Sequence, residues 1–154
     1  ILHWVAGFFG GYFFYSLISK EKNYTFIIRF LGVFYAYFLL GLVLNWVFTP
    51  ITAAADFGFV LNELSSEAQN ALLRDFTSFF VATFLFSILG VITLNPVWFF
   101  SAGIVYIGAG IFNLVAIYAH GTGFNQIFIG EFVLGSWPII LGLVIYQKQK
   151  KAEE

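Results

Sequence analysis

The longest uncharged stretch is the feature that most constrains this chain. From Phe76 to Gly130 no Asp, Glu, Lys or Arg interrupts the sequence. A helix that crosses the hydrocarbon layer of a bilayer needs about 20 mostly apolar residues, so the stretch is too long for one crossing and suits two. Runs such as Phe79 to Phe86 do not alternate as the strands of a membrane barrel do. The stretch therefore predicts two consecutive transmembrane helices.

The composition of the whole chain agrees with this prediction. Hydrophobic residues make up 60% of the sequence and charged residues only 10%, whereas about a quarter of the residues of a soluble domain are charged. A soluble enzyme, a nucleic-acid binder and a disordered chain are excluded. The absence of Cys removes disulfides and thiolate catalysis, and no P-loop, dinucleotide fingerprint or His-Glu-x-x-His motif occurs. We predict a non-enzymatic, all-α transmembrane bundle that forms a single domain over residues 1–154.

Charges and helix-terminating residues divide the chain into about five predicted helices, at 1–18, 26–49, 66–94, 96–119 and 126–147, with an outer loop at 50–65. Asn95 caps and Pro96 suits a first helical position, so this pair separates the third helix from the fourth. Gly121 ends the fourth helix, and Ser66 with Gln69 resembles a capping box that begins the third. Because the sequence begins at Ile1 and contains no Met, we expect residues to precede it.

Basic residues predict the orientation of the bundle. With five crossings, every Lys and Arg except Arg74 falls on one side of the membrane. Cytoplasmic loops carry an excess of Lys and Arg, so the N-terminus is expected outside and the C-terminus inside. We expect a multi-pass protein of a bacterial inner (plasma) membrane.

Glu131 is the clearest ionisable residue inside a predicted span. A charged side chain at the bilayer centre costs about 2.5 kcal/mol or more, so such residues usually face the bundle interior. The helical face of Glu131 continues as Gly135, Pro138 and Gly142, small residues that allow close helix approach. Pro138 also frees the carbonyl of Leu134 from its helical bond. We therefore predict that Glu131 points into the bundle.

Polar residues of other helices are expected at the same outer level, and with Glu131 they form the predicted pocket for a ligand or a proton: Asn45, Arg74, Asp75, Tyr106, Asn113 and His120. Arginine can meet a carboxylate through two parallel bonds. We predict that Arg74 pairs with Glu131 and Asp75 with His120. These pairs either only join the helices or line an outward-opening pocket, in which a carboxylate beside a histidine could titrate near neutral pH.

The two histidines are the candidate ligands of a cofactor. His3 and His120 lie at the outer ends of their predicted helices, which makes bis-histidine haem ligation geometrically feasible. A metal site from His120 with Asp75 or Glu131 is a second option. The many aromatic residues pack in the core or face lipid, or offer a flat apolar surface for a quinone, carotenoid, sterol or porphyrin.

From Arg29 to Gln147 the chain resembles the small four-helix membrane proteins of the DoxX-like kind and related domains of unknown function. The resemblance rests on four hydrophobic helices, on Arg74-Asp75 at the start of one and on Glu131 near the start of the last. The predicted helix at 1–18 departs from that plan. The resemblance implies a small bundle, sometimes tied to membrane redox systems, and no defined reaction.

Three functions remain open at this stage. The first is a non-enzymatic subunit or ligand- and lipid-binding module in the bilayer, which associates with itself or with other membrane subunits. The second is a small proton-linked transporter or channel, with Glu131, Arg74 and His120 along its path. The third is a membrane redox subunit that binds haem or quinone near His3 and His120. No nucleic-acid partner is expected.

Overall fold

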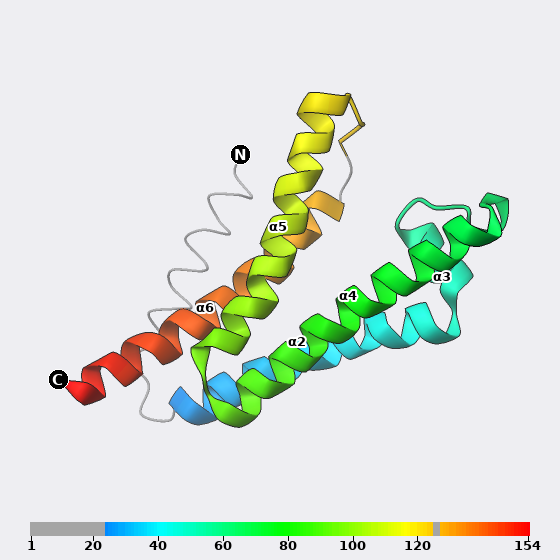
Figure 1. Ribbon diagram of the computed structural model, residues 1–154. Helices are drawn as coiled ribbons and strands as arrows, with labels where there is room; N and C mark the ends of the chain where they lie inside the picture. Colours follow the sequence, from blue (N-terminus) through cyan, green and yellow to red (C-terminus); the bar gives the residue numbers. More distant parts are fainter. Residues whose placement is uncertain (1–23, 125–126) are drawn as a thin grey trace.

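The computed structural model describes residues 24–124 and 127–154, which form an all-α structure (Figure 1). Its elements are α2 (Tyr24–Phe48), α3 (Pro50–Asp56), the short 3-10 helix η1 (Leu61–Glu63), α4 (Ser66–Thr93), α5 (Pro96–His120) and α6 (Ile127–Glu153). The helices α2, α4, α5 and α6 are each long and apolar enough to cross a membrane. This part of the chain is therefore a helical bundle typical of an integral membrane protein. The helix predicted at 1–18 lies outside the described residues.

Local signals explain the ends of α5. The side chain of Asn95 accepts a hydrogen bond from the backbone N–H of Val97, and Pro96 occupies the first turn. Gly121 ends the helix with φ of 66°, a left-handed conformation that glycine adopts without steric cost. The predicted division at Asn95 and the predicted stop at Gly121 are both confirmed.

Helix α4 begins at Ser66 as predicted, but its capping residue and the end of α6 differ from the prediction. The N-cap of α4 is Ser65 rather than Ser66, because the Ser65 hydroxyl accepts the N–H of Ala68 at 3.3 Å. Helix α6 continues to Glu153 instead of ending near 147. The residues from Gln147 onward are good helix formers, so the onset of charge there marks the limit of the apolar span and not of the helix.

The predicted outer loop at 50–65 contains two helical segments, α3 and η1. Pro50 suits the first position of α3 because its missing N–H has no helical partner there. Ala53 and Ala54 of α3 and Leu61 of η1 are buried against Trp46 and its aromatic neighbours. Tertiary packing, which the local sequence does not reveal, therefore folds this connection onto the bundle.

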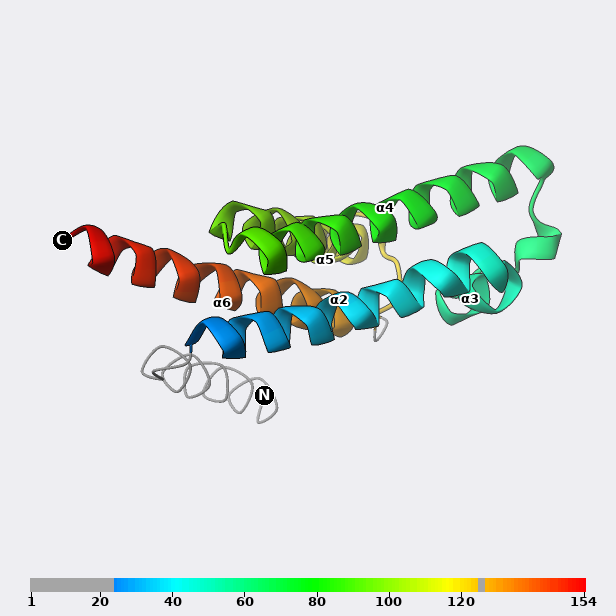
Figure 2. The ribbon, with the colours of Figure 1, turned by 90° about the horizontal axis from the view of Figure 1, so that it is seen from below.

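The long helices form two pairs, α2 with α4 and α5 with α6. Figure 1 shows that the pairs meet at one end and diverge toward the other, and Figure 2 shows α4 and α5 in one layer above α2 and α6. We call the meeting end the basic end: it holds the start of α2, the α4–α5 turn and the last turns of α6. The diverging end, with α3, η1, the start of α4 and the α5–α6 connection, is the acidic end.

A small core closes the basic end, with Ile28, Phe99, Leu141, Val144 and Ile145 buried together. The ring of Phe99 occupies the space that a side chain would need at two glycines. A Cβ at Gly32 would lie 3.0 Å from the ring, and one at Gly90 would lie 2.8 Å from it. Gln149 Nε2 donates to the carbonyl of Leu94 at 3.1 Å. These contacts join α2, α4, α5 and α6 at this end.

Small residues hold α5 against α6, as their spacing predicts. A Cβ at Gly135 would lie 2.8 Å from the side chain of Ile107, and one at Gly142 would lie 2.7 Å from Phe100. Gly103 meets the carbonyl of Gly135 in the same way. Because the two helices approach so closely, α5 and α6 stay together as a pair where they diverge from α4 toward the acidic end.

Candidate ligand-binding cavity

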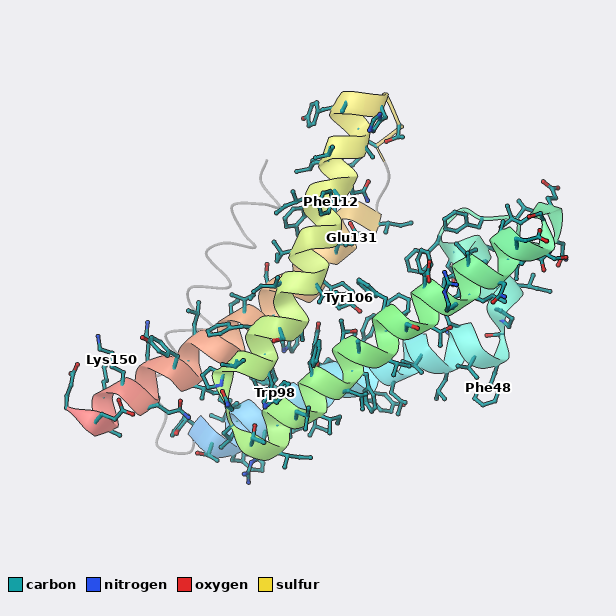
Figure 3. All side chains as sticks on the ribbon, viewed as in Figure 1. Phe48, Trp98, Tyr106, Phe112, Glu131 and Lys150 are labelled. Carbon is teal, nitrogen blue, oxygen red and sulfur yellow. The ribbon has the colours of Figure 1, made fainter. Side chains whose placement is uncertain are left out.

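A cavity of about 440 Å³ lies where the two helix pairs diverge. Volumes of roughly 300–1,000 Å³ are typical of sites for small molecules. All four long helices and the residue that follows α3 contribute to it, and its lining residues are Phe38, Leu42, Phe57, Asp75, Phe76, Phe79, Phe80, Tyr106, Ala109, Ile127, Gly130, Glu131 and Leu134. Figure 3 labels Tyr106 and Glu131 on the α5–α6 pair, near where it separates from α4. The lining is apolar except at a few positions.

Aromatic rings of α4 form one wall of the cavity. Phe76 stacks on the buried ring of Trp46, with 4.5 Å between the centroids, and meets Phe57 edge-on at 5.1 Å. Further along α4, Phe79 meets Tyr106 edge-on at 5.0 Å. Edge-to-face and offset-stacked pairs each add about 0.5–1.5 kcal/mol beyond the area they bury. The wall is therefore a continuous set of rings in mutual contact.

Tyr106 closes the deep end of the cavity between α4 and α5. Its side chain is buried, and its hydroxyl lies 3.5 Å from the hydroxyl of Thr83. Thr83 also donates to the carbonyl of Phe79 at 3.1 Å. Such bonds satisfy a buried Thr hydroxyl inside its own helix. Tyr106, predicted as a pocket residue, does line the cavity, whereas no sequence pattern indicates Thr83 beside it.

Tyr35 of α2 bonds to the backbone that Pro138 disrupts. Its hydroxyl donates to the carbonyl of Leu134 at 2.9 Å. That carbonyl would normally accept the N–H of residue 138, which proline lacks. Leu134 itself lines the cavity. The predicted release of the Leu134 carbonyl from its helical bond is confirmed, and a side chain from a different helix donates to that carbonyl.

Glu131 lines the cavity, so the prediction that it faces the bundle is confirmed. Its Oε2 accepts a hydrogen bond from Nδ2 of Asn113 at 3.2 Å. The predicted pairing with Arg74 is wrong. Arg74 Nε instead meets Oδ1 of Asp75 at 2.7 Å, and both side chains are about two-thirds exposed, at 65% and 64%. The start of α4 has diverged from α6, so the nearest carboxylate to Arg74 is its own neighbour in sequence.

The other predicted site residues divide into two groups. Asp75 lines the cavity, but it bonds Arg74 and not His120, so that predicted pair is wrong as well. His120 at the end of α5 and Asn45 on α2 are exposed and do not line the cavity. His3 lies outside the described residues. Within residues 24–124 and 127–154, no three His, Asp or Glu side chains gather as metal ligands.

The structure adds residues that polarity alone could not identify. Phe38, Phe57 and Phe79 line the cavity, yet in the sequence they resemble the many Phe residues that face lipid. One signal was present: Phe79 follows Asp75 by four residues, which puts both on one face of the helix, and Phe76 lies three residues before Phe79. Aromatic residues that share a face with a membrane carboxylate are better candidates for a binding surface than scattered ones.

Comparison with protein-family models, curated proteins and solved structures found no match to this chain. The resemblance to DoxX-like proteins therefore stays a prediction.

Proposed function

We propose that this protein is a non-enzymatic, integral-membrane module that binds a hydrophobic small molecule or lipid between its two helix pairs. The observation that carries the proposal is the cavity itself: about 440 Å³, walled by aromatic rings and bordered by carboxylates at the acidic end. Ligand sites are mostly apolar with a few polar groups that fix orientation, and the lining has this composition.

The surroundings of the cavity support a membrane location. Large apolar side chains cover the outside of the long helices; Phe26, Phe48 and Phe112, for example, are 71%, 74% and 73% exposed. A soluble monomer rarely exposes contiguous apolar patches of more than a few hundred Å². This exposed apolar surface is compatible with contact to lipid tails.

Charge supports an orientation with the basic end in the cytoplasm. Arg29, Lys148 and Lys150 lie at that end, where Lys148 Nζ sits 5.6 Å from the ring centroid of Tyr24. Described residues of the acidic end include Arg74, which Asp75 neutralises. Because cytoplasmic loops carry an excess of Lys and Arg, this distribution supports a position of α3 outside. We include in this proposal that the membrane is a bacterial inner membrane and that, with the predicted helix at 1–18, the N-terminus lies outside.

Depth along the helices supports a cavity in the outer half of the membrane. Tyr106 lies about 15 Å along α5 from Pro96, at 1.5 Å per residue, which is half of a hydrocarbon layer of about 30 Å. Glu131 lies only about 6 Å along α6 from Ile127. The cavity thus extends from near the midplane to the outer boundary.

A proton-linked transporter is the second candidate, because within residues 24–124 and 127–154 Glu131 bonds the amide of Asn113 and no basic side chain. Ionisable groups inside membranes often mark proton or substrate paths. If Glu131 carries protons, Glu131→Gln in proteoliposomes abolishes the proton flux that accompanies transport, while Glu63→Gln on η1, the same chemical change outside the cavity, does not.

Co-purification tests the binding proposal. Ala109 lines the cavity, and Ala119 is an exposed residue of the same helix. We expect native mass spectrometry of protein from native membranes to show a bound small molecule in the wild type and in Ala119→Phe, and its loss in Ala109→Phe, because the added ring fills the cavity. Equal occupancy in all three proteins, or no bound molecule in the wild type, contradicts the proposal.

A further inference from the structure

The polar groups of the cavity are not equivalent. Asp75 is already neutralised by Arg74 at 2.7 Å, and the hydroxyl of Tyr106 lies beside that of Thr83. Glu131 accepts one side-chain hydrogen bond, from Asn113 to Oε2. In the part of the chain that the structure describes, the ion pair of Arg74 is the one salt bridge found. Among the residues that the structure describes, Glu131 is thus a carboxylate at the edge of an apolar cavity without a basic side chain bonded to it.

A carboxylate in this position can accept more hydrogen bonds than the described residues donate to it. Its two oxygens provide about four lone-pair sites, and one Asn113 N–H occupies one of them. Hydrogen bonds between a carboxylate and a cationic donor are about twice as strong as neutral ones. In a membrane segment such a group is usually paired with an opposite charge. A molecule in the cavity is in position to supply that charge.

The rest of the lining specifies the other part of the ligand. Phe38, Phe79 and Leu134 offer only carbon surface, and the aromatic wall continues to Tyr106 near the midplane. A ligand whose charged group meets Glu131 would extend an apolar body along this wall toward Tyr106. The volume suits one drug-sized molecule or a single short chain.

We propose that the cavity binds a small lipophilic amine, whose ammonium group pairs with the carboxylate of Glu131 while its apolar body lies against Phe76 and Phe79. This inference rests on the proposed ligand-binding function and adds the charge and polarity of the ligand. The same chemistry can come from a free amine that enters from outside or from the amino head group of a lipid in the outer leaflet.

Fluorescence quenching in nanodiscs of phosphatidylcholine tests the proposal. The probes are three ω-bromoalkyl amphiphiles of one chain length that end in an amine, an alcohol or a carboxylate. Bromine quenches tryptophan, and Trp46 stacks on Phe76 at the cavity wall, so its fluorescence reports occupancy. The variants are Glu131→Gln and, as the matched control outside the cavity, Glu63→Gln on η1, whose side chain is exposed. A Trp46→Phe protein identifies the signal of Trp46.

In the wild type and in Glu63→Gln we expect saturable quenching, with the amine at least tenfold tighter than the alcohol and the carboxylate weakest. Tenfold corresponds to about 1.4 kcal/mol. Glu131→Gln should bring the amine to the affinity of the alcohol without weakening the alcohol, which also shows that this variant folds. If phosphatidylethanolamine added to the nanodiscs competes with the amine probe, the natural ligand is a lipid head group. If it does not compete, the natural ligand is a free amine.

Two results overturn the inference and differ in what they reject. If no probe quenches saturably, the binding function itself fails. If the three probes bind equally, or if Glu131→Gln keeps the preference for the amine, the cavity binds ligands but Glu131 does not select a cation.

Discussion

The hydrogen bond from Tyr35 to the carbonyl of Leu134 in α6 gives the sharpest test of the packing. Tyr35→Phe removes a hydroxyl that donates to the carbonyl of Leu134 at 2.9 Å and leaves the ring stacked on Trp137, at 6.4 Å between centroids. Because Pro138 has no N–H, the carbonyl then loses its partner. A buried unsatisfied group costs about 1–3 kcal/mol, and polar contacts between membrane helices contribute about 0.6 kcal/mol on average and up to about 1.7. We expect a loss of about 1 kcal/mol in the free energy of unfolding.

A double-mutant cycle with Pro138→Ala isolates this effect. In the Pro138→Ala background the N–H of residue 138 can bond the carbonyl of Leu134, so Tyr35→Phe should cost less than about 0.5 kcal/mol there. Tyr37→Phe on the same helix is the matched control, since its side chain is 73% exposed, and should change nothing. Unfolding by titration of denaturing detergent into mixed micelles, followed by circular dichroism, provides the free energies. An equal cost of Tyr35→Phe in both backgrounds would refute the reasoning.

Three further outcomes are expected. Gly103→Ala should lower the free energy of unfolding by about 1–3 kcal/mol, because the new Cβ would lie 2.8 Å from a backbone carbonyl of α6. Gly108→Ala should not lower it, because nothing lies within 4 Å of that position. The same detergent titration measures both variants, and equal effects would contradict the close approach of the two helices. The chain contains no Cys, so a single Cys at Glu63 should react with an impermeant maleimide on intact cells and one at Lys150 only after permeabilisation; the reverse pattern would overturn the orientation. Arg74→Gln should leave the unfolding midpoint unchanged, because its ion pair is exposed, and a clear drop would show a role that this geometry does not provide.

The sequence predicted the fold where the signal is local or periodic. Asn95 and Gly121 mark the ends of α5 through their own backbone and side-chain chemistry, and the small residues that face α5 from α6 follow helical spacing. Pro138 predicted an unsatisfied carbonyl. The partner of that carbonyl, Tyr35, is remote in sequence, and no periodic pattern connects the two.

The candidate site was predicted only in part, for a physical reason. Glu131 and Tyr106 were found because a polar group inside lipid is costly and must face protein. The predicted pairing of Glu131 with Arg74 was wrong because complementary charge says nothing of distance, and the two helix pairs diverge at the level of these residues. The aromatic wall escaped prediction because Phe residues that line a cavity and Phe residues that face lipid look alike in the sequence.

The position of a bound bromoalkyl amine tests the central claim most directly. Crystals of the protein with the ω-bromo amine, measured at the bromine absorption edge, would locate the bromine by its anomalous scattering. The account predicts one dominant peak between the α2–α4 and α5–α6 pairs, near Phe79 and Tyr106, with the amine at Glu131. Peaks found only on the lipid-facing outside of the helices, with the cavity empty, would contradict it.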